Sequence, residues 1–287
     1  MIRVDTIYRT GLLLMLGSAL LFSTAGLFTK GVAASAWQVI FWRALFSSLL
    51  TFGIVAARGR WRFEVTQMGR RGVLAAVISA LATAAFLSAF KLTSVANVAL
   101  IYATSPLVAA VLAWLVIREE PGRRMLMGAV LGLRGIAIIM AGSLGELHLM
   151  GDLLALCMAL GLAVLFVLYR TWPDVPAAGP TALSSVILLP VAALMAPPLA
   201  VSGVEIAIMA VFGLVFALAS VMMFEAAKRL PSGQAGLLST AETPFAMMLA
   251  WAILAEWPTS ATWVGGALVM AGVVLGGMPR AKRQEPS

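Results

Sequence analysis

The chain has 287 residues, of which 62% are hydrophobic and only 11% are charged. A chain with so little charge and a mean hydropathy of +1.01 cannot enclose its apolar side chains in one water-soluble core. These values exclude an ordinary soluble domain and indicate an integral membrane protein. The meaning of its net charge of +8 depends on where the basic residues lie along the chain.

Ten apolar stretches are each long enough to cross a hydrocarbon layer of about 30 Å as an α-helix. In chain order they cover residues 11–30, 36–57, 72–92, 95–117, 125–142, 151–169, 179–197, 205–227, 234–255 and 261–278. The first stretch has the basic flank of a signal peptide, but nine further stretches favour a retained helix. We therefore predict an all-α integral membrane protein with ten transmembrane helices.

Lysine and arginine are distributed unevenly between the segments that connect these stretches. If the N-terminus is cytoplasmic, sixteen of the 20 lysines and arginines fall in cytoplasmic segments. These sixteen are Arg3, Arg9, Arg58, Arg60, Arg62, Arg70, Arg71, Arg118, Arg123, Arg124, Arg170, Lys228, Arg229, Arg280, Lys282 and Arg283. The bias follows the positive-inside rule and predicts a multi-pass protein of a bacterial inner membrane with both termini in the cytoplasm. Topology thus explains the pI near 10.6, and we expect no nucleic-acid partner.

The second half of the chain repeats the first half at an offset of 137 positions. The match extends over about fifty residues without a gap, and it aligns Lys91 with Lys228 and Gly128 with Gly265. Each half holds five stretches, so the second half must enter the membrane from the opposite side. We predict two inverted five-helix repeats, residues 1–145 and 146–287, around a central cavity near the middle of the bilayer.

The two halves close on related signatures, SPLVAAVLAW followed by EEP and ETPFAMMLAW followed by EWP. With ten stretches and this length, the chain resembles the EamA-type members of the drug/metabolite transporter superfamily, and among them the bacterial exporters of amino acids, including aromatic ones. The resemblance implies that helices 1, 3, 4, 6, 8 and 9 surround the cavity, with helices 5 and 10 more peripheral. The two signatures differ from each other in one respect, because the acid that begins the second signature has no counterpart in the first.

Three ionisable residues lie inside the predicted helices, where each costs about 2.5–3.5 kcal/mol on insertion scales and usually faces a cavity or a partner. Glu242 lies about eight residues, or about 12 Å, into the ninth helix. It is either a substrate-binding or proton-exchanging acid, or a structural acid bonded to its neighbours. Arg43 in the second helix either contacts substrate or holds helices together, and Arg134 in the fifth helix either has a function or extends toward the membrane surface.

Small polar residues accompany these charges on helices expected around the cavity. The candidate substrate-binding set is Glu242, Tyr102, Ser239, Thr243, Asn97, Thr104, Ser105, Ser79, Thr83, Ser23, Thr24 and Arg43. Pro106 and Pro244 lie inside the fourth and ninth helices and are expected to kink them, because proline removes a backbone hydrogen bond inside a helix. The polar faces of these two helices are expected to meet at one cavity.

The sequence contains no metal-binding pair, nucleophile elbow or phosphate-binding loop, so we expect neither an enzyme nor a bound cofactor or metal. The favoured function is a secondary transporter that exports small metabolites, above all amino acids, by alternating access. A multidrug or lipophilic-cation exporter is the main alternative, and a non-transporting membrane protein is a weaker one. The expected partners are the small-molecule substrate and membrane lipids, and a monomer is favoured over a homodimer.

Overall fold

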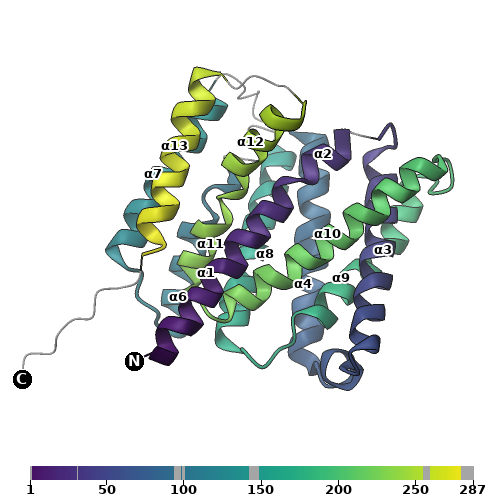
Figure 1. Cartoon of the computed structure of the whole chain (residues 1–287), viewed down its shortest axis with the longest axis horizontal. Helices are drawn as coiled ribbons and strands as arrows, with labels where there is room; N and C mark the ends of the chain where they lie inside the picture. Colours follow the sequence, from purple (N-terminus) through teal and green to yellow (C-terminus); the bar gives the residue numbers. More distant parts are fainter. Residues whose placement is uncertain are drawn as a thin grey trace, which may run out of the picture.

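The computed structural model describes residues 2–30, 32–93, 98, 101–141, 149–254 and 259–278, and in these residues it is helical with no strand (Figure 1). The elements are α1 (Ile2–Ser23), α2 (Ala25–Lys30), α3 (Ala36–Ala57), the π-helical turn η1 (Arg62–Thr66), α4 (Gly69–Leu92), α6 (Ser105–Ile117), α7 (Arg123–Met140), α8 (Leu149–Thr171), α9 (Ala178–Met195), α10 (Gly203–Ala227), α11 (Ser232–Ser239), α12 (Glu242–Leu254) and α13 (Ser260–Gly276). Six described helices are long and apolar enough to span a membrane, and α6 and α13 are shorter apolar helices.

Local sequence explains where several helices begin. Ser35 and Gln38 form a capping box at the start of α3, and Ser202 and Glu205 form another at the start of α10. In each box the serine hydroxyl accepts a hydrogen bond from a backbone N–H of the first turn, and the longer side chain accepts one from the serine N–H.

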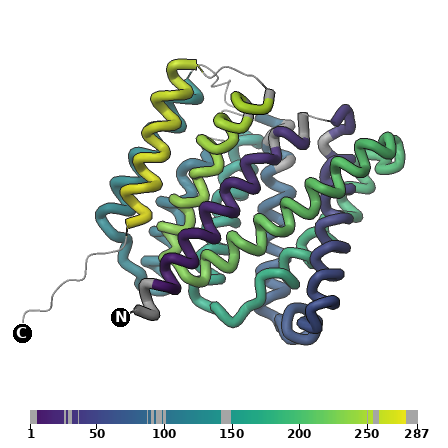
Figure 2. Tube along the Cα trace, viewed as in Figure 1, coloured from purple at the N-terminus to yellow at the C-terminus, as the bar shows by residue number. Residues whose placement is uncertain are grey.

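Helices from the two halves of the chain pack against each other in pairs. Helix α7 packs against α13 at one edge of the molecule and α3 packs against α9 at the other, while α1 with α10 and α4 with α8 lie between them (Figures 1 and 2). Each pair joins one helix from the first half to one from the second. This arrangement confirms the all-α inverted-repeat fold. The predicted boundary at residues 145 and 146 lies in segment 142–148, outside the described residues.

Four glycines show the symmetry between the halves at atomic detail. A Cβ placed on Gly128 would clash with the carbonyl oxygen of Gly272, and one on Gly265 would clash with the carbonyl oxygen of Gly135. An offset of 137 positions converts the first contact into the second. The helices α7 and α13 are therefore related by a pseudo-twofold axis and approach too closely for any side chain at these positions.

Two carboxylates tie the halves together at opposite ends of the helices. Glu64, just before α4, accepts hydrogen bonds from the N–H groups of Ala178 and Gly179 at the start of α9. Glu205, in the first turn of α10, accepts hydrogen bonds at 2.9 and 3.1 Å from the N–H groups of the two residues before Ser35. Helix α4 corresponds to α10 under the repeat, and α3 corresponds to α9. The two carboxylate contacts are therefore equivalent, and one lies at each end of the helices.

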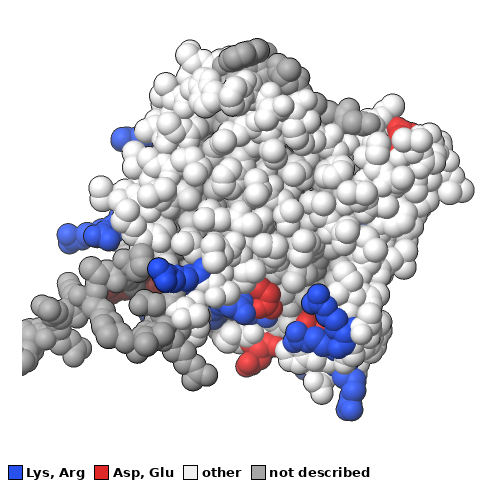
Figure 3. Space-filling model, viewed as in Figure 1, with Lys and Arg blue, Asp and Glu red and all other residues white. Residues whose placement is uncertain are grey.

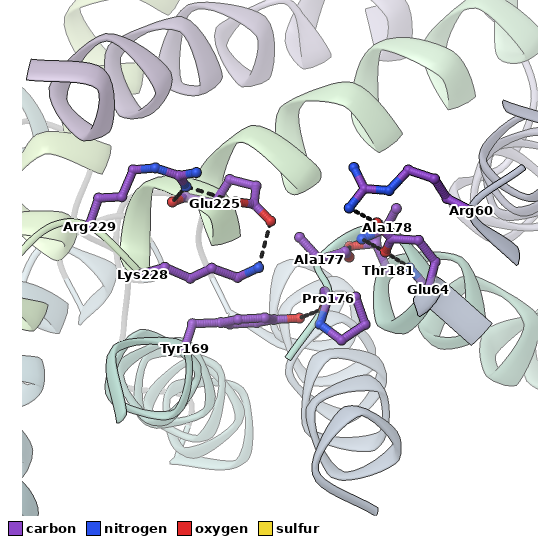
Figure 4. A network of polar contacts seen from close by, with 11 residues as sticks. Arg60, Glu64, Tyr169, Pro176, Ala177, Ala178, Thr181, Glu225, Lys228 and Arg229 are labelled. Atoms are coloured by element: carbon purple, nitrogen blue, oxygen red, sulfur yellow. Dashed lines mark hydrogen bonds and ion pairs between the residues drawn. The ribbon is translucent and has the colours of Figure 1, made fainter. Parts of the chain in front are cut away.

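Most lysine and arginine side chains on the face shown in Figure 3 lie toward the end that holds the N-terminus. We call this end, formed by residues 58–71, 118–124, 170–178 and 228–232, the basic end. Glu225 forms ion pairs there with Lys228 and Arg229, three and four residues further along, at 2.5 and 2.7 Å (Figure 4). In the same region the Tyr169 hydroxyl donates to the Pro176 carbonyl.

Candidate functional site

The fourth and ninth helices are both broken in the middle. The chain leaves helical geometry at Ala103 and Thr104 before α6, and at Thr240 and Ala241 between α11 and α12. The offset of 137 positions places Ala103 on Thr240, so the two breaks are equivalent under the repeat. The sequence predicted kinks at the nearby prolines, and the structure instead shows an interruption of each α-helix two to four residues before the proline.

At each break a threonine hydroxyl donates to a carbonyl that also accepts the backbone N–H of the same threonine. The Thr104 hydroxyl donates to the Ile101 carbonyl at 2.6 Å, and the Thr240 hydroxyl donates to the Leu237 carbonyl at 2.7 Å. A third interruption separates α1 from α2, where the Thr24 hydroxyl donates to the Leu21 carbonyl at 2.6 Å. Such hydrogen bonds allow an irregular backbone inside a membrane protein without leaving polar groups unsatisfied.

The two broken helices meet through residues that the repeat relates. The hydroxyl oxygens of Tyr102 and Ser239 lie 3.4 Å apart, and the two residues are separated by 137 positions. The pseudo-twofold axis therefore passes between them. Gly236 of α11 also packs closely against the backbone of Pro106. The structure thus brings together the polar residues that the sequence places on these two helices.

Glu242 is the first residue of α12, one turn beyond Ser239. No hydrogen bond or ion pair joins its carboxylate to any residue in the described part of the chain. Glu242 and Tyr102 both lie close to the pseudo-twofold axis, and the side chain of each is only partly buried.

Ser105 occupies the position of Glu242 in the first half. It is the first residue of α6, it is 0% exposed, and its hydroxyl has no hydrogen-bond partner among the described residues. Leaving a buried polar group unsatisfied costs about 1–3 kcal/mol. The sequence placed Ser105 in the candidate set for its helical face alone. The equivalence of Ser105 to Glu242 under the repeat is the stronger reason to keep Ser105 in the candidate set.

Other predicted site residues lie in different surroundings. Ser23 donates to the Leu20 carbonyl beside the break after α1. Thr243 on α12 is half-buried, as are Ser79 and Thr83 on α4, which packs mainly against α8 and α9. The structure shows no contact between these two α4 residues and the breaks. Asn97 lies outside the described residues.

Arg43 is placed apart from the broken helices. It lies on α3, which packs mainly against α9 and α10, and its guanidinium stacks 3.8 Å from the centre of the Phe216 ring. The residue is 4% exposed, and its Nη1 atom has no hydrogen-bond partner among the described residues. Arg134 is exposed on the outer surface of α7, at the edge of the molecule.

The sequence interpretation missed Glu119 as an interhelical contact. Its carboxylate accepts hydrogen bonds from Arg170 Nε at 3.0 Å and from the N–H of Ser232, the first residue of α11, at 2.9 Å. Glu119 therefore connects the loop after α6 to two helices of the other half at the basic end. The only signal in the sequence was its alignment with Glu256 in the repeat.

A hollow of about 350 Å³ lies beside the basic end between α6 and α7, with Trp114 and Pro121 among its lining residues. None of the predicted site residues lines it. The surface is largely apolar and lies on the outside of the helix pair, where lipid chains would contact it. The partly buried residues Tyr102 and Glu242, beside the pseudo-twofold axis, are therefore the better candidates for binding a solute.

An inverted repeat, discontinuous helices at equivalent positions and an unpaired acid at their junction together define a multi-pass membrane protein built like a secondary transporter. A search of curated proteins finds no match. The model of the EamA-like transporter family matches residues 9–141 and again residues 149–277, so the chain belongs to the EamA-like transporter family. The family predicted from the two signatures is thereby confirmed, and the protein is a membrane transporter of small molecules.

A solved structure, titled only as the crystal structure of a protein, has the same fold. It superposes with a TM-score of 0.80 over 93% of this chain and 96% of the other, at 20% sequence identity. Identity at this level supports a common architecture, and it leaves the substrate to be argued from the residues of this chain.

Proposed function

We propose that the protein exports amino acids across a bacterial inner membrane by alternating access, with Glu242 as the group that handles the substrate ammonium or a coupled proton. The observation that carries the proposal is the unpaired carboxylate at the start of α12, beside the pseudo-twofold axis. An ionisable group at this depth without a partner is costly unless it serves a transported species. A carboxylate at this position suits a substrate with a charged amino group.

The inverted repeat supplies the mechanical part of the proposal. Two similar bundles of opposite orientation can exchange conformations, so that states open to either side have similar free energies. At the basic end, Glu119, Arg170 and Ser232 join the two halves, and Tyr169 stacks on Phe224 with ring centres 4.6 Å apart. Tyr169 and Phe224 both belong to the second half, so the contacts of Glu119 are the ones that join the halves here, and under this proposal they loosen when substrate enters from the basic end.

We propose that the basic end faces the cytoplasm, together with both termini, because lysine and arginine accumulate there. We also propose a monomer. The glycines of α7 and α13, which could otherwise mediate a dimer, pack against each other within one chain. Membrane lipids then cover the outer surface of these two helices.

Flux into proteoliposomes tests the role of Glu242. Uptake of radiolabelled leucine, methionine and phenylalanine is measured at several pH values for wild type and for Glu242→Gln. We expect the variant to lose most of the uptake and its pH dependence. Asp174→Asn, which changes an exposed acid between α8 and α9, should behave as wild type. If Glu242→Gln leaves both the uptake and its pH dependence unchanged, neither role of the acid survives.

A lipophilic-cation exporter is the second candidate function, and the same unpaired acid in largely apolar surroundings supports it. Competition separates the two candidates. If cationic dyes abolish amino-acid flux at low concentration and are themselves transported, the acid selects cations in general. We expect amino acids to be transported and the dyes to compete weakly.

A further inference from the structure

The hollow between α6 and α7 has a filled counterpart in the second half of the chain. Trp114 on α6 and Leu126 on α7 line the hollow. The offset of 137 positions places these two residues on Trp251 and Trp263, whose rings meet edge to face with their centres 5.8 Å apart. Because the first half has leucine where the second half has a second tryptophan, the space that this ring fills stays open beside Trp114.

The dimensions of the hollow suit one acyl chain. Its lining extends along α6 from Leu107 to Trp114 and then to Glu120 and Pro121 at the basic end. From Leu107 to the end of α6 at Ile117 the helix rises about 15 Å, which is half the thickness of the hydrocarbon layer. The volume of about 350 Å³ is more than twice that of an apolar cavity of about 150 Å³, which is large enough to bind benzene. A chain from the leaflet at the basic end can therefore lie lengthwise in the hollow.

Two arginines extend the walls of the hollow toward the basic end. Arg118 follows Trp114 by four residues, and Arg123 precedes Leu126 by three residues. Residues at these spacings lie on one face of a helix, so each arginine lies beyond a lining residue on the side of the basic end. Both arginines are exposed. The second half has alanine and serine at the equivalent positions, so the open hollow and the two charges occur together in the first half.

The charges at this mouth of the hollow favour an anion. Arg124 adds a third exposed arginine in the first turn of α7. Of the two nearby acids, Glu119 already accepts hydrogen bonds from Arg170 and from the N–H of Ser232, and Glu120 is the acid among the lining residues. Positive charge is therefore in excess here. Guanidinium groups bind phosphate oxygens through pairs of charge-assisted hydrogen bonds, and basic residues at a membrane surface attract anionic lipids.

We propose that the hollow binds one acyl chain of an anionic phospholipid, phosphatidylglycerol, whose phosphate is held by Arg118 and Arg123. The bound lipid packs against α6, the half-helix that follows the break at Ala103 and Thr104. The inference goes beyond the proposed function, because the lipid site is independent of the transported solute and can be measured without transport.

Lipids with the same chains and different headgroups test the site. Native mass spectrometry of the full-length protein, in detergent micelles that contain phosphatidylglycerol or phosphatidylcholine, measures the affinity for the first bound lipid. We expect phosphatidylglycerol to bind about tenfold more tightly than phosphatidylcholine. The double variant Arg118→Gln with Arg123→Gln should lose this preference, since it removes the charge-assisted hydrogen bonds. Leu126→Trp copies the second half and should weaken the binding of both lipids about tenfold.

Matched controls separate the site from general attraction to the basic end. Arg62→Gln with Arg70→Gln removes two other exposed arginines there, and Met127→Trp adds the same ring at the next, exposed position of α7. Both controls should bind phosphatidylglycerol like wild type. The proposal is wrong if a control weakens binding as much as its matched variant, or if wild type does not distinguish the two lipids. A wild-type dimer that Leu126→Trp abolishes would instead identify a second copy of the chain as the occupant. The arginine variants decide the question even if Leu126→Trp fails to fold.

Discussion

The contact between α7 and α13 gives a quantitative test of the pseudo-twofold packing. In Gly128→Ala, the new methyl group would overlap the backbone carbonyl of Gly272, which cannot move without shifting its helix. Overpacking of this kind costs about 1–3 kcal/mol. Because the contact between Gly265 and Gly135 is equivalent, Gly265→Ala should cost about the same.

Gly53→Ala is the matched control, since nothing lies within 4 Å of the position of its added Cβ on α3. In a helix interior this substitution should be neutral or stabilising by about 0.5–1 kcal/mol. Reversible unfolding in mixed micelles, followed by tryptophan fluorescence, measures all three variants. If Gly128→Ala is as stable as Gly53→Ala, the close approach of α7 and α13 is wrong.

Three other outcomes follow from the described contacts. Arg43→Met should leave the melting temperature unchanged or raised, because it removes a buried charge that has no ion-pair partner among the described residues. A fall of several degrees in thermal unfolding would reveal a missed partner. Glu119→Gln should destabilise the protein by about 1–2 kcal/mol through the lost ion pair with Arg170, and an unchanged denaturation midpoint would contradict that contact. In a background without the native cysteine, Arg60→Cys should react with a membrane-impermeant thiol reagent only from the cytoplasm and Ser202→Cys only from outside, and the reverse pattern would invert the topology.

Most of the architecture could be predicted because it depends on hydrophobic length and on internal repetition. The second predicted helix, 36–57, coincides with α3, and the offset of 137 positions relates the two glycine contacts and the two breaks. The breaks themselves were underestimated. Proline indicates a missing hydrogen bond, but whether the helix bends or stops depends on the turn that precedes it, here one in which Thr104 or Thr240 bonds the carbonyl three residues earlier through both its N–H and its hydroxyl.

The site was harder to predict, because a sequence gives the helical face of a residue without giving the helix that it faces. Tyr102 and Ser239 are brought together by the broken helices, whereas Arg43 faces Phe216 across the contact of α3 with α10. Ser105 carried no signal of its own. Only its position in the repeat, together with its unpartnered hydroxyl, connects it to Glu242.

Chemical modification of Glu242 tests most directly whether this acid binds the transported solute. Hydrophobic carbodiimides react with carboxyl groups in apolar surroundings, and mass spectrometry of the peptide that contains Glu242 measures the extent of reaction. We predict that Glu242 is modified in the purified transporter, and that leucine, methionine or phenylalanine slows the modification in proportion to its occupancy of the site. Modification at the same rate with and without saturating amino acid would contradict the assignment of Glu242 to the substrate site.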